Sequence, residues 1–298
     1  MEVLVMDLRP SLLLAILPLL SGFLAAGALA GPQADDVEVK AELKHASDEV
    51  VARFLQRYEA ALQAKDSAGV VTVLQEMLGY DNAELLPAGE DALRYKASAE
   101  DVRAVKQEAA DLGIRKPAEI KAMVARRESD VQVLGVAIVA NVGGEKAGPT
   151  LHQMFKNKAL RKEKPRVAAA LIAGMGQVRY EKVLAEVEDE YRAYANREVM
   201  KAAIRYFGQT ECKSLAVARM LAGDLDAPEP TDVDAASNPP ASYWQARWEA
   251  WNFVKRDVAW ALKRITGQDF RPAEDPNPGD GAKALKYIEE NAKRLGLR

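Results

Sequence analysis

The sequence predicts an all-α fold, a right-handed α-solenoid built from antiparallel helix pairs. The first observation is a pattern that recurs in residues 130–222. Three segments of helical periodicity end there at Gly143, Gly176 and Gly208, at intervals of 33 and 32 residues. The second observation is that each segment carries the same apolar stripe upstream of its glycine. A helix pair of this length cannot bury its stripe alone, so the pairs are expected to stack.

The stripe occupies the positions nine, six and five residues before each glycine, which share one face of a helix. A fourth copy ends at Gly267, 59 residues after Gly208. Alanine at the middle position lets neighbouring helices approach closely, and we expect each final glycine to provide a left-handed C-cap. The four stripes are Leu134, Ala137 and Ile138; Val167, Ala170 and Leu171; Val199, Ala202 and Ala203; Val258, Ala261 and Leu262.

Helix pairs of this period, with an aliphatic–x–x–Ala–aliphatic stripe and a final glycine, resemble HEAT-like repeats of the short bacterial type. The resemblance covers residues 130–267 and, in weaker form, 45–127. It implies a stacked helical fold rather than one activity, because repeat folds host many tasks. Tetratricopeptide and ankyrin arrays have a similar period, but their characteristic sequence patterns are missing.

The rest of the chain is organised around the regular repeats. Residues 31–129 are expected to form atypical N-terminal helical units, as is common at the end of an array. Residues 223–242 are acidic and proline-rich without any period, which predicts an insertion loop between units. Residues 243–298 are expected to supply the last repeat helix and a C-terminal capping helix.

Three local patterns lie within the N-terminal units. Ser67 is expected to cap a helix that ends at Gly79. Residues 80–97 contain asparagine, proline and glycine and are expected to form a connection. The segment 98–101, Ser-Ala-Glu-Asp, resembles a capping box with aspartate in the third helical position.

Residues 1–30 have the pattern of a secretory signal peptide. Arg9 precedes a run of 19 apolar residues, which ends in the small-residue site Ala28-Leu29-Ala30. Cleavage after Ala30 predicts an exported protein, periplasmic or extracellular. The alternative is an uncleaved anchor, because 19 apolar residues nearly span a bilayer. The protein contacts a membrane only in that alternative.

Composition disfavours several functions. The chain has 41 basic and 44 acidic residues, a net charge of −3, so no nucleic-acid partner is expected. It has two histidines and a single cysteine, Cys212, which cannot form a disulfide or a thiolate zinc site. His152 and Cys212 are expected to be packed rather than reactive. We therefore expect no enzyme activity, no catalytic residue, no cofactor and no metal.

An aromatic cluster opens the last long helical segment. Its three tryptophans fall at i, i+4 and i+7, on one helix face. One interpretation is core packing against the preceding unit. The other is an exposed partner-binding patch of the residue types that are enriched at interface hot spots. The residues of this cluster are Tyr243, Trp244, Arg247, Trp248 and Trp251.

The basic run 156–166 has two interpretations. Six lysines and arginines could attract an anionic polymer or lipid headgroups. The run has little of the aromatic interleaving that is typical of nucleic-acid binding, which favours a charged connection in solvent.

These patterns favour a noncatalytic scaffold or adaptor that binds another protein outside the cytoplasm. One alternative is a small-molecule or chromophore-binding, lyase-like HEAT protein, which requires a pocket with convergent polar groups. A further alternative is a structural envelope component that self-associates.

Overall fold

The computed structural model of the chain describes four stretches: residues 43–193, 196–228, 238–270 and 279–298. All four belong to the compact unit Leu43–Arg298. The predicted signal peptide, residues 1–30, lies outside the described residues, as does the central part of the predicted insertion loop, residues 229–237. The described residues form thirteen α-helices and one pair of short parallel strands, β1 (Lys44–His45) and β2 (Tyr80–Asp81). The predicted all-α class is confirmed.

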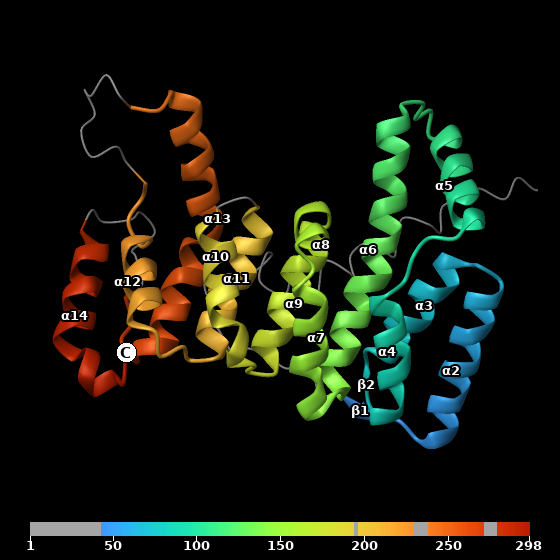
Figure 1. Ribbon diagram of the computed structural model, residues 1–298, viewed down its shortest axis with the longest axis horizontal. Helices are drawn as coiled ribbons and strands as arrows, with labels where there is room; N and C mark the ends of the chain where they lie inside the picture. The colour runs from blue at the N-terminus through green and yellow to red at the C-terminus, as the bar shows by residue number, and fades with distance from the viewer. Residues whose placement is uncertain (1–42, 194–195, 229–237, 271–278) are drawn as a thin grey trace, which may run out of the picture. The chain divides into compact units, whose positions relative to one another are not determined.

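Four helices that carry the repeat stripe pack against one another in sequence order (Figure 1). They are α6 (Pro117–Val142), α9 (Pro165–Gln177), α11 (Arg197–Gln209) and α13 (Ala241–Thr266). A second helix follows each of the first three and packs on this row: α7 (Ala147–Phe155), α10 (Leu184–Arg192) and α12 (Leu215–Gly223). Shorter elements lie before α4, α7, α9 and α10: the 3₁₀ turns Ala83–Leu85, Gly144–Lys146 and Glu181–Val183, and α8 (Lys158–Glu163).

The predicted stripe forms the interior of this row. Every stripe residue is buried except Ala137, which is half-buried. A single hydrophobic cluster contains residues of all four helices. Burying one large aliphatic side chain contributes about 1.5–3 kcal/mol to folding. The stripe of each helix is buried by neighbouring helices of the row, so this contribution depends on the packing between helices.

The left-handed C-cap is found at only one of the four repeat glycines. Gly267 is left-handed, with φ 74°, whereas Gly143 has φ −76°. Gly176 and Gly208 lie inside their helices. The expectation was therefore wrong at Gly143, Gly176 and Gly208.

Gly176 and Gly208 are required for close packing instead. A Cβ atom added at Gly176 would lie 3.1 Å from Cα of Tyr206 in α11. A Cβ atom added at Gly208 would lie 2.9 Å from Cε3 of Trp260 in α13. At these two positions the repeated glycine thus marks the place where the next helix in the row approaches the backbone.

The N-terminal units contain α2 (Asp48–Gln63), α3 (Ser67–Met77), α4 (Leu86–Leu93) and α5 (Ala99–Asp111). Helix α4 lies inside the segment that we expected to be a connection, because Pro87 occupies its first turn, where a missing N–H is tolerated. Gly89 allows close contact with α6, where a Cβ atom would lie 2.8 Å from Cγ2 of Ile138. Proline and glycine therefore support this helix rather than end it.

The capping residues are partly those expected. The capping box at 98–101 is confirmed, with Ser98 and Asp101 each bonded to the other's backbone N–H. The N-cap of α3 is Asp66 rather than Ser67, because the Asp66 carboxylate accepts the Gly69 N–H at 3.0 Å. The backbone N–H of Ser67 donates a hydrogen bond to the Asp101 carboxylate.

The last helix of the chain packs against α12. Helix α14 (Asp280–Leu295) contacts α12, with Ile288 fully buried. Arg298 exchanges backbone hydrogen bonds with Lys213 and Leu215, both 2.9 Å long, which holds the end of the chain in place. None of the helices in the described stretches combines the length and the apolar character that a membrane span requires.

Candidate functional site

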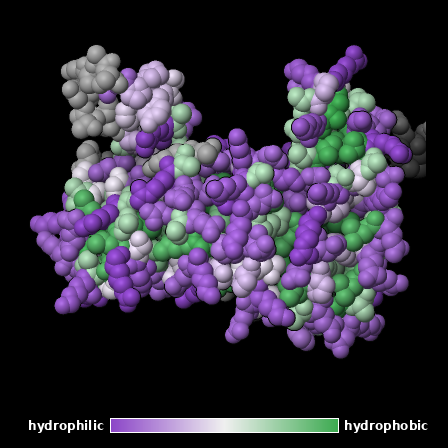
Figure 2. Space-filling view, in the orientation of Figure 1, coloured by the Kyte–Doolittle hydropathy of each residue, from purple (hydrophilic) through white to green (hydrophobic). Residues whose placement is uncertain are grey.

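The predicted aromatic cluster lies on the first turns of α13, which extend past α10 and α11 in Figure 1. Tyr243 is 42% exposed and Trp248 is 45% exposed. Within the described residues, just one other large hydrophobic side chain, Leu112, is comparably exposed. Figure 2 shows this segment as a pale projection, because tyrosine and tryptophan have intermediate hydropathy.

Trp251 belongs to the core instead. It is 6% exposed, and its indole Nε1–H donates to the backbone oxygen of Asp224 at 3.1 Å. Its ring lies 6.3 Å from that of Trp248 in a tilted arrangement. The helix therefore carries both arrangements that the sequence left open: Trp251 packs inward, and Trp248, one turn earlier, faces solvent.

Cations already lie on the aromatic rings of this helix. Arg247 donates to the Tyr243 hydroxyl at 3.0 Å, and its Cζ lies 5.7 Å from the centre of the Tyr243 ring. The Nζ atom of Lys255 lies 5.0 Å from the centre of the Trp251 ring. Cation–π contacts at these distances are attractive.

A pocket of about 310 Å³ adjoins the exposed aromatics. Its walls come from α10, α11, α13 and the residues after α12, and Trp244, Arg247 and Trp251 belong to both the predicted cluster and the pocket. Its acidic residues are Asp224 and Asp226. The Asp224 carboxylate accepts the Tyr191 hydroxyl at 2.5 Å, and the Asp226 carboxylate accepts the backbone N–H of Gly281 at 3.1 Å.

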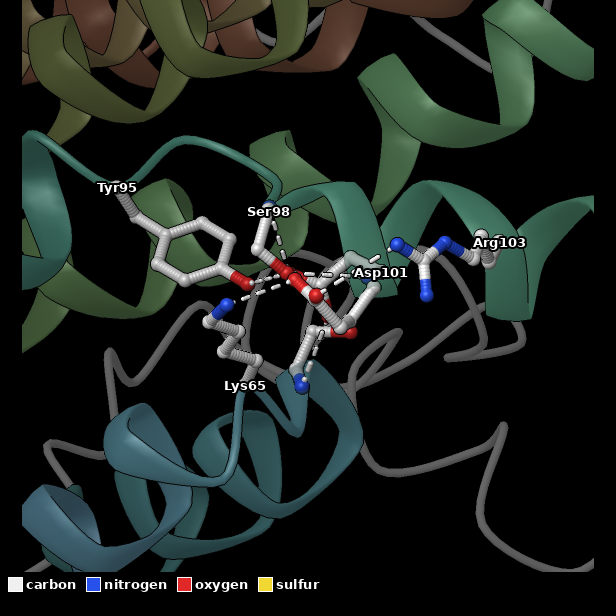
Figure 3. Close-up of polar contacts among 7 residues, drawn as sticks. Lys65, Tyr95, Ser98, Asp101 and Arg103 are labelled. Carbon is white, nitrogen blue, oxygen red and sulfur yellow. Dashed lines mark hydrogen bonds and ion pairs between the residues drawn. The ribbon is translucent and has the colours of Figure 1, made fainter.

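A second site, which the sequence reasoning missed, surrounds Asp101, a carboxylate that is 3% exposed. It accepts four hydrogen bonds: from the Tyr95 hydroxyl at 2.7 Å, from the Ser98 N–H and hydroxyl at 2.8 and 2.9 Å, and from the Ser67 N–H at 3.2 Å. Figure 3 shows Tyr95 and Ser98 turned toward it. Near it, Lys65 pairs with Glu100 at 3.1 Å. The capping box was the available signal, but nothing in it indicated Tyr95 or Ser67.

The hydrogen bonds decide the protonation of this site. Burial alone would raise the pKa of Asp101, but the bonds from Tyr95, Ser98 and Ser67 outweigh it and hold the pKa below its usual value. Burial, followed by the bond to Asp101, raises the pKa of Tyr95. An ionised carboxylate with a low pKa is a poor general base.

The pocket beside Asp101 has a volume of about 360 Å³. Asp101 joins the amino ends of α3 and α5, where a negative charge is favourable. Asp91, also in the wall, accepts the Tyr58 hydroxyl at 2.9 Å. We conclude that these carboxylates tie helices together.

His152 and Cys212 lie in packed positions, as expected. His152, with a side chain 12% exposed, has Nε2 2.8 Å from Glu186 Oε1 and Nδ1 3.5 Å from the Tyr180 hydroxyl. Cys212 is buried, and this burial raises the pKa of its thiol, which disfavours the reactive thiolate. Across the described stretches, no three His, Cys, Asp or Glu side chains are grouped as metal ligands.

Half of the basic residues in the run 156–166 form ion pairs within the protein. Arg161 pairs with Glu190 at 2.6 Å, Lys164 pairs with Glu128 at 2.6 Å, and Arg166 pairs with Asp130. These pairs hold α8 and the start of α9 against α10 and α6. They leave the three lysines at 156, 158 and 162 as the remaining exposed cations of the run.

Comparisons with protein-family models, with curated proteins and with solved structures found no match for this chain. Statements about its function consequently rest on its own residues. These are the exposed half of the aromatic cluster, the pocket beside it and the buried carboxylate network.

Proposed function

We propose that this chain is a noncatalytic scaffold or adaptor, a right-handed HEAT-like α-solenoid of antiparallel helix pairs that binds another protein outside the cytoplasm. The observation that carries the proposal is the exposure of Tyr243 and Trp248 on the first turns of α13. The consecutive packing of α6, α9, α11 and α13 supports the solenoid.

Exposed aromatic side chains on a folded helix favour an interface. Because Trp248 is exposed, its apolar surface contributes little burial free energy to folding. Trp251, on the same helix face, is buried in the core. Tryptophan, tyrosine and arginine are the residue types most enriched at hot spots, where truncation costs about 2 kcal/mol or more of binding free energy. Trp248, Tyr243 and Arg247 supply all three types within two helical turns.

Crosslinked capture from the native envelope fraction tests the proposal. The tagged wild-type protein is expected to recover a stoichiometric protein partner, and Trp248→Ala is expected to lose it while keeping the wild-type melting temperature. Asn252→Ala is the matched control, because Asn252 is exposed on the same helix outside the cluster. Recovery of the partner by Trp248→Ala at the wild-type level would show that the aromatic patch is not the binding surface.

The pocket supports a second candidate, a small-molecule-binding protein. A volume of about 310 Å³ lies at the lower end of the range for ligand sites. A ligand at 100 times its dissociation constant should add about 2.7 kcal/mol to the unfolding free energy. Thermal unfolding with an extract of small molecules from the native source tests this candidate, and an unchanged melting temperature counts against it.

Export and self-association have separate tests. Cleavage after Ala30 predicts a mature amino terminus at Gly31, which intact mass measurement on protein from the native envelope can determine. A retained leader in that measurement would favour the anchored alternative. Self-association predicts an oligomeric mass for the purified mature protein, and a monomer counts against it.

A further inference from the structure

We propose that the pocket beside the aromatic patch receives an organic cation, the ammonium or guanidinium group of a lysine or arginine side chain of the protein partner. The inference rests on the proposed protein-binding function and specifies the chemistry of the partner. The pocket is the one described above, between Tyr191, Trp244, Trp251, Asp224 and Asp226.

Three aromatic rings line the pocket, and two of them are fixed in place. The Tyr191 hydroxyl donates to the Asp224 carboxylate, and the Trp251 indole N–H donates to the Asp224 backbone oxygen. Their polar atoms are thus engaged with one residue. The faces of such rings attract cations, and Trp is the most effective of them.

The same helix already binds its own cations in this way. Arg247 lies over Tyr243, Lys255 lies over Trp251, and Arg197 of α11 has its Cζ 5.0 Å from the centre of the Phe253 ring. The cation–π contact proposed for the pocket is therefore of a type that α13 already makes at several of its aromatic rings.

Charge in the pocket favours a cation as well. Asp224 and Asp226 face a single basic lining residue, Arg247, whose guanidinium contacts Tyr243. The Asp226 carboxylate accepts a backbone N–H from Gly281, and none of the ion pairs of the described stretches includes it. A carboxylate that lines the same pocket as aromatic rings is a suitable counter-ion for an incoming ammonium or guanidinium group.

The surrounding sequence adds to this attraction. Among the described residues between Arg219 and Arg247 there are two carboxylates, Asp224 and Asp226, and no lysine or arginine. A local excess of one sign speeds the approach of an oppositely charged partner.

The position of the pocket explains how a protein partner would reach it. Trp244 and Arg247 line the pocket, and the exposed Tyr243 and Trp248 are their sequence neighbours. Tyr243 and Trp244 also make an edge-to-face contact, with ring centres 5.2 Å apart. A partner seated on the exposed aromatics can therefore place one long side chain in the pocket.

The test follows the tryptophan indole N–H signals of the purified protein by NMR. The probe is N-acetyl-arginine methylamide, and the neutral control probe is N-acetyl-glutamine methylamide. The indole signals of Trp244 and Trp251 are expected to shift saturably with the arginine probe, whereas that of Trp260, outside the pocket, stays in place. The glutamine probe is expected to shift none of them.

Two variants with opposite expected effects test the charge argument. Asp226→Asn keeps the oxygen that accepts the Gly281 N–H but removes the charge, and should weaken probe binding about fivefold or more. Arg247→Gln removes the competing cation and should tighten binding at least about twofold. Glu249→Gln, an exposed carboxylate on the same helix outside the pocket, should leave binding unchanged.

Equal shifts with both probes, or the same affinity in wild type and Asp226→Asn, would overturn the cation assignment. This outcome can be told apart from failure of the proposed function. If Trp248→Ala abolishes partner capture while the arginine probe does not bind, the aromatic surface stands and its partner uses another side chain in the pocket.

Discussion

The ring of Trp260 in α13 lies directly against the backbone of Gly208 in α11. A Cβ atom at position 208 would come within 2.9 Å of Cε3 and 3.0 Å of Cη2 of that ring. Trp260 is half-buried and packs on the hydrophobic cluster, so its ring cannot move away without disturbing the α11–α13 contact. This glycine joins the third and fourth helices of the row.

We therefore expect Gly208→Ala to destabilise the protein by about 1–3 kcal/mol, as overpacking does in other cores. Urea unfolding followed by circular dichroism measures the change. The matched control is Gly223→Ala near the end of α12, where a Cβ atom would meet nothing within 4 Å. There alanine should be neutral or stabilise by up to about 1 kcal/mol through helix propensity. Equal effects of both changes would contradict the packing explanation.

The tryptophans of the aromatic cluster differ in burial, so we expect their substitutions to differ in their effect on the unfolding free energy. Trp251→Ala should cost about 3–5 kcal/mol, because it removes a buried ring and the hydrogen bond to Asp224. Trp248→Ala should change the unfolding free energy by no more than about 0.5 kcal/mol, as is usual for exposed positions. The same urea series measures both. A large loss at Trp248 would place it in the core and remove the basis of the proposed binding surface.

Arg179 occupies a left-handed conformation with φ 52° after α9. A side chain there costs about 1–2 kcal/mol relative to a right-handed backbone, a cost that glycine does not have. The Arg179 side chain makes a loose ion pair with Glu211 at 3.9 Å, with both groups exposed, and such pairs contribute little.

Arg179→Gly is accordingly expected to raise the unfolding free energy by about 0.5–1 kcal/mol. Arg179→Ala removes the same ion pair but keeps the Cβ atom, so it isolates the backbone effect and should give no gain. The melting temperatures of the two variants provide the comparison. If both rise equally, the side chain rather than the backbone is responsible.

The regular part of the fold could be predicted because its signal is periodic. Valine, alanine and leucine recur at the same offsets in four helices, and all of these positions except Ala137 are buried. The role of the repeated glycine could not be predicted, because a left-handed cap and a close helix contact both require glycine. The backbone conformation of the residues after each helix distinguishes the two roles. After α9 and α11, Arg179 and Glu211 rather than the repeat glycines adopt the left-handed conformation.

The site could be predicted only in part. Spacing placed the three tryptophans on one face, but spacing does not reveal where the neighbouring helix ends. Trp251 is covered and Trp248 is not. Helix α4 was missed because Pro87 and Gly89 are ordinarily helix breakers. Tyr95 was missed because its partner, Asp101, becomes buried only when α3 and α5 meet.

Asp101 makes the stability of the N-terminal units sensitive to acid. The pKa of this carboxyl is lowered in the folded protein, so the unfolded chain binds the proton more readily. The contribution of Asp101 is fully present above the unfolded pKa of about 3.9 and is lost as the pH falls through the folded pKa. The unfolding free energy should therefore decline as the pH falls below about 4.

Asp101→Asn isolates this contribution, because it keeps one acceptor oxygen and cannot titrate. At neutral pH it should cost about 1–3 kcal/mol, since some of the four donors from Tyr95, Ser98 and Ser67 lose their acceptor. Its unfolding free energy should also decline less than that of wild type as the pH falls below about 4, because the variant has no titrating group at this position. Urea unfolding at a series of pH values measures both effects. Parallel pH profiles of the variant and the wild type would show that other carboxylates carry the acid sensitivity, and that the hydrogen bonds around Asp101 hold the amino ends of α3 and α5 together without lowering its pKa.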